Sequence, residues 1–181
     1  MKSKLISLGR VPLFLSLFLL MSFSASVAQP ENSEPMTLAN LAKELIRQDV
    51  QHWKVVMAQA IVESGWKFDS KMVRKANNFV GMRVPNNRPS SRIGEFSGYS
   101  KYGRWQDCVT DIKYWQQQNW EGGTDEEYLD FIASIWAESP VYKQHVQIVM
   151  RKLDRLTEQL KHQNKDHFNY QVISAYLSEN S

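Results

Sequence analysis

The chain has 181 residues, of which 22 are Lys or Arg and 19 are Asp or Glu, giving a formal net charge of +3. The three charged residues among the first 28 (Lys2, Lys4 and Arg10) are all basic, so the remaining 153 residues are balanced at 19 bases and 19 acids. Because a general nucleic-acid-binding protein is normally basic overall, this balance argues against nucleic acid as a partner. The single cysteine, Cys108, excludes an internal disulfide, and 153 residues are enough for one domain with its own core.

Residues 1–28 have the pattern of a secretory signal peptide. The basic residues lead into an apolar run from Val11 to Met21, and Ser26 to Ala28 offer a small-residue cleavage site. The run is too short to span a bilayer and no second hydrophobic stretch follows it, so we expect an exported protein, periplasmic or secreted, with no stable membrane anchor after cleavage. A retained signal anchor is the alternative. No cysteine directly follows the cleavage site, which excludes a lipid anchor there.

A flexible leader and two helices are expected next. Residues 29–36 contain two prolines, two acids and no apolar pattern, which predicts the leader. Thr37 is a typical N-cap residue, and the apolar period that follows it predicts a helix carrying Leu38, Leu41, Ala42 and Leu45. We expect this helix to pack on a second one from Trp53 to Glu63, and we assign residues 37–160 to one domain.

The second helix ends on a carboxylate. By helical spacing, Glu63 shares its face with mostly apolar residues: Ala60, Gln59, Val56 and Trp53. Gly65, just beyond, is a good helix stop. A carboxyl group half desolvated near the negative end of a helix dipole should have a raised pKa, as a general acid requires. The alternative is a surface glutamate in the last turn, and spacing alone does not decide between the two.

Residues 77–104 are a different kind of chain, rich in Gly, Pro, Asn and Ser. This composition is typical of turns and short strands, so we expect an irregular lobe with one short β-hairpin. Between Lys67 and Arg104 there are nine bases and two acids, a net charge of +7. Such a patch beside a general acid suits an anionic polymer, although a solvated loop equally explains any single side chain.

Helical periodicity returns at Trp105. Cys108, Val109, Ile112 and Trp115 form one stripe, which makes Cys108 a core residue rather than a nucleophile. A capping box at Thr124–Glu127 begins the next helix, which runs to Trp136.

Ser139 and Pro140 predict the start of a last helix, buried over its first half. It carries Val141, His145, Ile148, Val149, Leu153, Leu156 and Leu160. The tail, residues 161–181, is too apolar for a free linker, and we expect it to pack on the domain. The four histidines are scattered, so no metal or other cofactor is expected.

Four segments follow one another in order: Ala58–Gly65 (Ala-Gln-Ala-Ile-Val-Glu-Ser-Gly), Asn77–Arg83 (Asn-Asn-Phe-Val-Gly-Met-Arg), Phe96–Trp105 and Trp136–Tyr142 (Trp-Ala-Glu-Ser-Pro-Val-Tyr). Together they resemble elements of the bacterial glucosaminidases of the flagellar-muramidase and autolysin type, most closely the short secreted forms. The resemblance covers roughly residues 53–146. Each motif is weak alone, but their order and spacing are specific.

The resemblance implies a mainly α, lysozyme-like α+β fold, in which a helical domain and a small irregular or β-hairpin lobe flank a cleft. It implies hydrolysis of the sugar backbone of peptidoglycan on the glucosamine side of the linkage, with Glu63 as general acid and glycan strands bound by a monomer. The residues expected to contact sugar are Asn78, Tyr99, Tyr102, Trp136 and Tyr142. Arg88 and Arg92 are expected to attract the carboxylates of the stem peptides.

Two positions depart from the family pattern: Trp136 replaces a tyrosine and Ser139 replaces an aspartate. An indole stacks on a sugar but has no phenolic hydroxyl. Glu95 is the one acid of the lobe that could serve as a second carboxylate, and an exposed turn residue is the alternative reading. With Glu95 across the cleft the reaction would invert; without it, the acetamido oxygen of the substrate could attack and the reaction would retain configuration. A wall-binding protein of weak or no activity and a lytic transglycosylase are the alternative functions.

Overall fold

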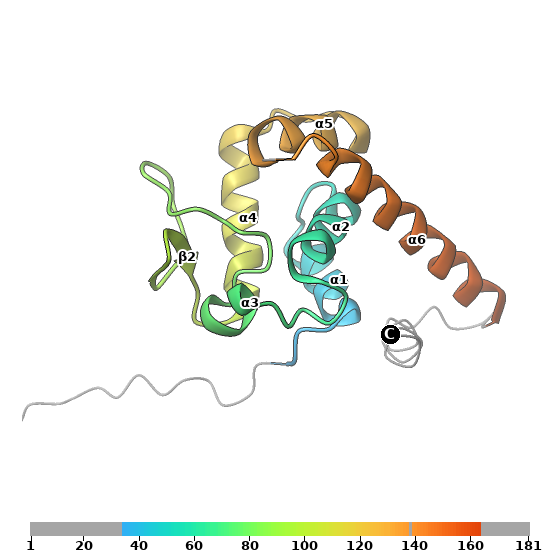
Figure 1. Cartoon of the computed structure of the whole chain (residues 1–181), viewed down its shortest axis with the longest axis horizontal. Helices are drawn as coiled ribbons and strands as arrows, with labels where there is room; N and C mark the ends of the chain where they lie inside the picture. Colours follow the sequence, from blue (N-terminus) through green and yellow to red (C-terminus); the bar gives the residue numbers. More distant parts are fainter. Residues whose placement is uncertain (1–33, 138, 164–181) are drawn as a thin grey trace, which may run out of the picture.

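The computed structural model describes residues 34–137 and 139–163. They form, in order, α1 (Leu38–Arg47), α2 (Trp53–Ser64), α3 (Lys71–Ala76), β1 (Gly94–Phe96), β2 (Tyr99–Lys101), α4 (Trp105–Asn119), α5 (Asp125–Trp136) and α6 (Tyr142–Gln163). In Figure 1 the hairpin lies on one side of α4, and α2 and α6 lie on the other. The predicted mainly α fold with a small hairpin lobe is confirmed. The signal peptide and residues 164–181 of the tail lie outside the described residues, so those predictions stay predictions.

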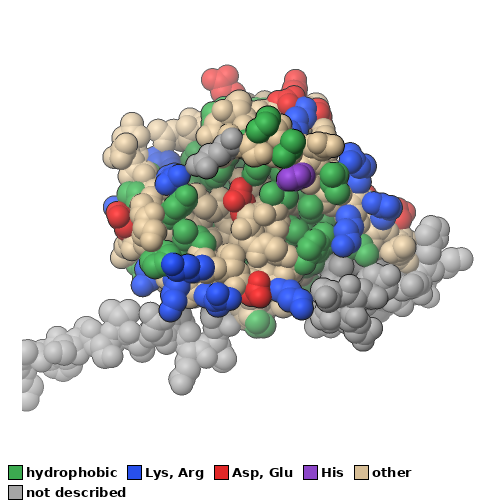
Figure 2. Space-filling view, in the orientation of Figure 1, with side chains coloured by type: hydrophobic (Ala, Val, Ile, Leu, Met, Phe, Trp, Pro, Cys, Tyr) green, Lys and Arg blue, Asp and Glu red, His purple; other side chains and the backbone are tan. Residues whose placement is uncertain are grey.

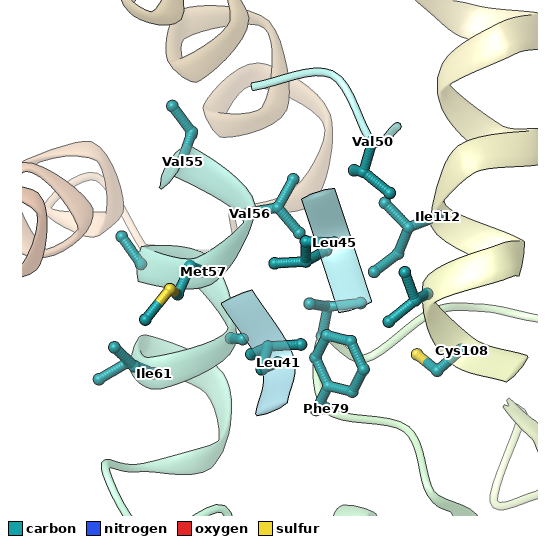
Figure 3. Packing of buried hydrophobic residues seen from close by; sticks show 14 of the residues in the cluster. Leu41, Leu45, Val50, Val55, Val56, Met57, Ile61, Phe79, Cys108 and Ile112 are labelled. Atoms are coloured by element: carbon teal, nitrogen blue, oxygen red, sulfur yellow. The ribbon is translucent and has the colours of Figure 1, made fainter. Parts of the chain in front are cut away.

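Helix α2 is the centre of the helical part. Eight of its 12 residues are buried, and it contacts α1, α5 and α6. A helix that is apolar on nearly every side is stable only when other elements surround it. Figure 3 shows Leu41 and Leu45 of α1 packed between α2 and the side chains of Phe79, Cys108 and Ile112. This packing holds α2 rigid up to its last turn.

The predicted helix starts are confirmed at two positions. The Thr37 hydroxyl accepts a hydrogen bond from the backbone of Asn40 at the start of α1, and Thr124 and Glu127 form the capping box of α5. Helix α3 was not predicted from the sequence, because six residues are too few to show a helical period. Ser70 caps it, and Asn77 ends it with a φ of 52°. No helix among the described residues is both long and apolar enough to cross a membrane.

The last three residues of the predicted flexible leader, residues 34–36, contact the domain. The indole Nε1 of Trp105 donates to the carbonyl of Glu34 at 2.8 Å, and the Asn40 side chain donates to the carbonyl of Pro35 at 2.9 Å. Met36 packs against the core. These contacts fix residues 34–36 on the domain, and residues 29–33 lie outside the described part.

Helix α6 begins at Tyr142 rather than at Pro140. The backbone N–H of Tyr142 donates to the carbonyl of Ser139 at 3.1 Å, so a turn precedes the helix. The predicted buried face is also wrong in part, because Val141, His145 and Ile148 are exposed. The face that packs on the core is one position away and consists of Tyr142, Val146, Val149, Met150 and Leu153.

The lobe contains little regular structure, so polar side chains hold it in place. Its hairpin pairs only Gly94 with Lys101, Glu95 with Ser100 and Phe96 with Tyr99. The amide of Asn77 donates to the carbonyls of Tyr102 and Gly103, both at 3.1 Å.

Asn78 also holds the lobe in place through side-chain hydrogen bonds to the backbone, at a more buried position. Its amide donates to the carbonyls of Met82 and Ser100, and its oxygen accepts from the N–H of Met82, each at 2.9 Å. One side chain therefore closes the turn over residues 78–82 and ties it to β2.

A buried ion pair joins the lobe to α4. The Arg88 guanidinium donates to both carboxylate oxygens of Asp111, at 2.6 and 3.1 Å, and the Tyr102 hydroxyl donates to the same carboxylate at 2.6 Å. The side chain of Arg88 is 6% exposed and that of Asp111 is fully buried. Bidentate geometry and the added hydroxyl satisfy the buried charge, which would otherwise be costly.

We predict that Asp111→Ala lowers the free energy of unfolding by about 3 to 5 kcal/mol, because it leaves the Arg88 charge buried without a counter-charge. Urea denaturation measures this change. The control is Lys143→Ala, which breaks ion pairs between exposed side chains of α5 and α6 and should change stability little. Equal small changes in both variants would show that the lobe does not depend on the buried pair.

Candidate functional site

A cleft of about 810 Å³ separates the helical part from the lobe. Glu63 and Ser64 of α2 contribute to its lining, as do residues 78–88 of the lobe except Phe79, Tyr99 of β2, the last turns of α4 and α5, and Tyr142 of α6. A volume of this size lies within the range of binding sites for small organic ligands. Figure 2 shows this side of the molecule: Lys and Arg side chains lie mainly around its margin, and its centre is mostly apolar or uncharged. The expected cleft between domain and lobe is therefore present.

Glu63 lies in the last turn of α2, where the helix meets the cleft. Gly65 ends the helix with a φ of 77°, a conformation that glycine adopts without strain. The face behind Glu63 is buried, as predicted, with Gln59 and Ala60 one turn earlier. Glu63 itself is exposed and lines the cleft, so the half-desolvated setting and raised pKa stay predictions.

Tyr142 lies against this carboxylate from the first turn of α6. Burial raises the pKa of its hydroxyl, and the charge of Glu63 raises it further. The hydroxyl therefore stays protonated, and it is close enough to Gln59 and Glu63 for both side chains to influence its pKa. Among the described residues, no contact of this hydroxyl meets hydrogen-bond geometry.

Aromatic side chains line both walls of the cleft. On the helical side, the rings of Trp115 and Trp136 meet edge to face with centroids 4.8 Å apart, and the Trp136 indole N–H donates to the carbonyl of Val80 at 3.1 Å. On the lobe side, the Arg83 guanidinium carbon lies 4.1 Å from the centre of the Tyr99 ring. Such partly exposed rings can stack on the apolar faces of sugars.

Three residues expected to bind substrate have structural roles instead. Asn78 is fully buried, and both hydrogens of its amide are donated to backbone carbonyls. Tyr102 is 1% exposed, and its hydroxyl is held by Asp111. Arg88 borders the cleft, but its charge is neutralised by the same carboxylate. These side chains shape the lobe and leave no polar group for a ligand.

Glu95 and Arg92 are exposed residues of the lobe, and neither lines the cleft. The sequence left two interpretations of Glu95 open, a second carboxylate opposite Glu63 or an exposed turn residue, and the structure does not bring the two carboxylates together in one lining. Among the described lining residues, Glu63 is the only one with a carboxylate. Residue 138, between two lining residues in sequence, lies outside the described part.

Three residues of the site lie outside the set predicted from the sequence. Trp115 was assigned to the core stripe of α4, yet it is only partly buried and borders the cleft. Arg83 directly follows the Gly81-Met82 turn, a position that the motif itself could have indicated. Gln59 is 2% exposed, and a buried amide on an apolar helix was the available signal.

From the sequence, Cys108 was expected to be a core residue rather than a nucleophile, and no metal site was expected. Cys108 is fully buried and burial raises the pKa of its thiol, which agrees with the predicted core role. The described residues contain no group of three or more His, Cys, Asp or Glu side chains able to hold a metal ion.

Comparison with known proteins agrees with this geometry. The family model described as glucosaminidase (mannosyl-glycoprotein endo-beta-N-acetylglucosaminidase) matches residues 39–155. A search among curated proteins found no match. The matched segment includes every element from α1 to most of α6, and with it Glu63 and both walls of the cleft. Because the family model covers well over half of the chain, this protein belongs to the glucosaminidase family.

Proposed function

We propose that this protein is an exported hydrolase that cleaves the glycan backbone of peptidoglycan at N-acetylglucosamine, with Glu63 as the general acid. Family membership supports glycan hydrolysis of this type. The signal-like residues 1–28 support export to the compartment that contains the cell wall.

The observation that carries the proposal is the position of Glu63 at the end of a rigid helix, in a cleft with aromatic side chains on both walls. Glycoside hydrolysis needs an acid that protonates the leaving oxygen. Trp136 and Tyr99 offer stacking surfaces on opposite sides, and an extended sugar chain between them would pass over Glu63. Acid and aromatic surfaces therefore occur in one cleft, as polysaccharide cleavage requires.

A substrate-assisted route suits the described lining better than an inverting one. An inverting enzyme needs a second carboxylate about 6.5 to 9.5 Å from the first, and the predicted candidate, Glu95, lies outside the lining. In the assisted route, the 2-acetamido oxygen of the substrate attacks its own anomeric carbon while Glu63 protonates the leaving oxygen. Water then opens the resulting ring, and the product retains its configuration.

The single carboxylate among the described lining residues also favours one second candidate, a lytic transglycosylase. Such an enzyme also works with one glutamate, but a hydroxyl of the muramic acid attacks in place of water. Mass spectrometry of digested wall fragments distinguishes the candidates: hydrolysis leaves new reducing glucosamine ends, and transglycosylation leaves anhydro-muramic ends. Intact fragments would indicate a wall-binding protein and would overturn the proposed function.

We predict that Glu63→Gln lowers kcat on wall fragments by at least about 100-fold, because glutamine keeps the shape of the side chain but has no proton to donate. Turbidity loss of purified walls, with circular dichroism to check folding, measures this change. A folded variant with activity within a few-fold of the parent would remove Glu63 from the mechanism.

Glu95→Gln is the matched control, since it makes the same chemical change in a carboxylate outside the cleft lining. We expect it to cleave at close to the parental rate, with product of retained configuration in both proteins by NMR of the fresh anomeric signal. A loss as large as that of Glu63→Gln, together with inverted product, would show that Glu95 acts as the base.

The exposed bases of the lobe should attract anionic wall fragments. We expect cleavage to slow as salt rises, because exposed charges more than about 8 to 10 Å apart are screened at physiological ionic strength. Arg83→Gln should raise KM and weaken this salt dependence, since Arg83 lines the cleft, whereas Arg92→Gln should change both less. The earlier candidate, Arg88, is unsuitable because its charge is already neutralised. Identical salt curves for all three proteins would mean that the lobe charges do not attract substrate.

A further inference from the structure

Two buried polar atoms behind Glu63 have no hydrogen-bond partner among the described residues. They are Nε2 of Gln59 and the hydroxyl oxygen of Tyr142. Gln59 is 2% exposed and Tyr142 is 7% exposed. Leaving one buried donor or acceptor unsatisfied is unfavourable, and two such atoms at one place in a native protein point to a functional role.

The two side chains converge on the same carboxylate. Gln59 lies one turn before Glu63 on the same face of α2, because residues four apart are neighbours on a helix. Tyr142 opens α6, which packs along α2. The pKa of its hydroxyl responds to both Gln59 and Glu63, so the phenol lies within reach of each.

We infer that Tyr142 is a positioning residue for Glu63: its hydroxyl accepts a hydrogen bond from Nε2 of Gln59 and donates one to a carboxylate oxygen of Glu63. The inference rests on the proposed function and adds a defined support to its acid. These two hydrogen bonds would satisfy both orphaned atoms at once. The tyrosine is an effective donor here, because burial keeps its hydroxyl protonated.

This bond has a consequence for proton transfer. With one carboxylate oxygen held by Tyr142, the acidic proton resides on the other oxygen, which faces the cleft. Hydrogen bonds to an ionised carboxylate are stronger than those to a neutral one. The bond from Tyr142 therefore strengthens as Glu63 gives up its proton to the leaving oxygen, so it stabilises the transition state more than bound substrate.

Trp136 stands where the family pattern has a tyrosine, and this difference makes the role of Tyr142 more important. Trp136 has no phenolic hydroxyl, and its indole N–H is donated to the carbonyl of Val80. Tyr99, the other described tyrosine of the lining, lies on the lobe under Arg83. On the helical side, Tyr142 is thus the described side chain that can donate a phenolic proton to Glu63.

The charged and titratable groups around Glu63 determine how its titration is interpreted. Among the described lining residues they are Arg83, Arg88 and Tyr99 from the lobe and Tyr142 from α6, while α4 and α5 contribute uncharged side chains. Arg88 is neutralised by Asp111. A variant that removes only the Tyr142 hydroxyl leaves all the cations in place.

The test compares Tyr142→Phe and Gln59→Leu with the parent and with Tyr128→Phe. Tyr128 is also buried, but it does not line the cleft, and its hydroxyl accepts a hydrogen bond from Gln116 at 2.9 Å. Tyr142→Phe should lower kcat about tenfold with KM little changed, because it removes one hydrogen bond to a charge. Its melting temperature should fall about as far as that of Tyr128→Phe, since each variant removes the hydrogen-bonded hydroxyl of a buried tyrosine.

The pH dependence separates positioning from packing. Without a donor to its ionised form, the pKa of Glu63 rises, so the alkaline limb of the kcat profile moves to higher pH in Tyr142→Phe. Gln59→Leu should shift the alkaline limb in the same direction. Tyr128→Phe should lower the melting temperature and leave the limb in place.

An NMR titration of the ¹³C-labelled Glu63 carboxyl, assigned by its absence in Glu63→Gln, gives the same comparison without any substrate. A parent that cleaves no glycan would overturn the proposed function, and the titration would still decide the role of Tyr142. A Glu63 midpoint that is identical in the parent and in Tyr142→Phe would overturn the inference.

Discussion

The buried bond between Arg88 and Asp111 is the interaction on which the cleft depends. Residues 77–104 contain two strands of three residues each, too few to hold a lobe in place by hydrogen-bonded pairing alone. Arg88, from the long loop, and Tyr102, just after the hairpin, converge on one carboxylate of α4. Because burying an unpaired charge is costly, the lobe has a strong preference for the position in which this network is complete. In that position the lobe provides the second wall of the cleft that Glu63 lines.

Much of the helical part could be predicted because its pattern has a single physical cause. Leu38, Leu41 and Leu45 repeat with the period of a helix and are buried, and Figure 3 shows Leu41 and Leu45 beside α2. Thr37 and Thr124 mark helix starts since their hydroxyls can satisfy backbone N–H groups that have no partner inside the helix. The position of Glu63 could be predicted for the same reason: helical spacing and Gly65 together place it at the end of a buried helix.

The roles of polar residues could not be predicted from residue type. Asn78, Arg88 and Tyr102 have the chemistry of sugar and carboxylate binding, and the fold directs the same groups at its own backbone and at Asp111. Whether such a side chain binds a ligand or holds the fold together depends on partners that are distant in sequence, such as Asp111 for Arg88. The periodic pattern of neighbouring residues does not reveal these partners. The face of α6 was missed for a similar reason. Its sequence has two neighbouring apolar stripes, and contact with α2 selects the one with Tyr142 and Val146.

Charge shows the same dependence on partners. The segment from Lys67 to Arg104 has a net charge of +7 in sequence, but Asp111, which lies outside it, neutralises Arg88. Arg83, by contrast, is exposed and lines the cleft, with its guanidinium over the ring of Tyr99. On the face shown in Figure 2, Lys and Arg side chains lie mainly around the margin, a distribution that suits a polymer whose sugars are neutral and whose side branches carry carboxylates. The sugar backbone would then lie over Glu63 between aromatic rings, and the charged branches would extend toward the exposed bases. In the proposed function, the helical wall would supply the acid, and the lobe, held by a few polar anchors, would supply the electrostatic attraction.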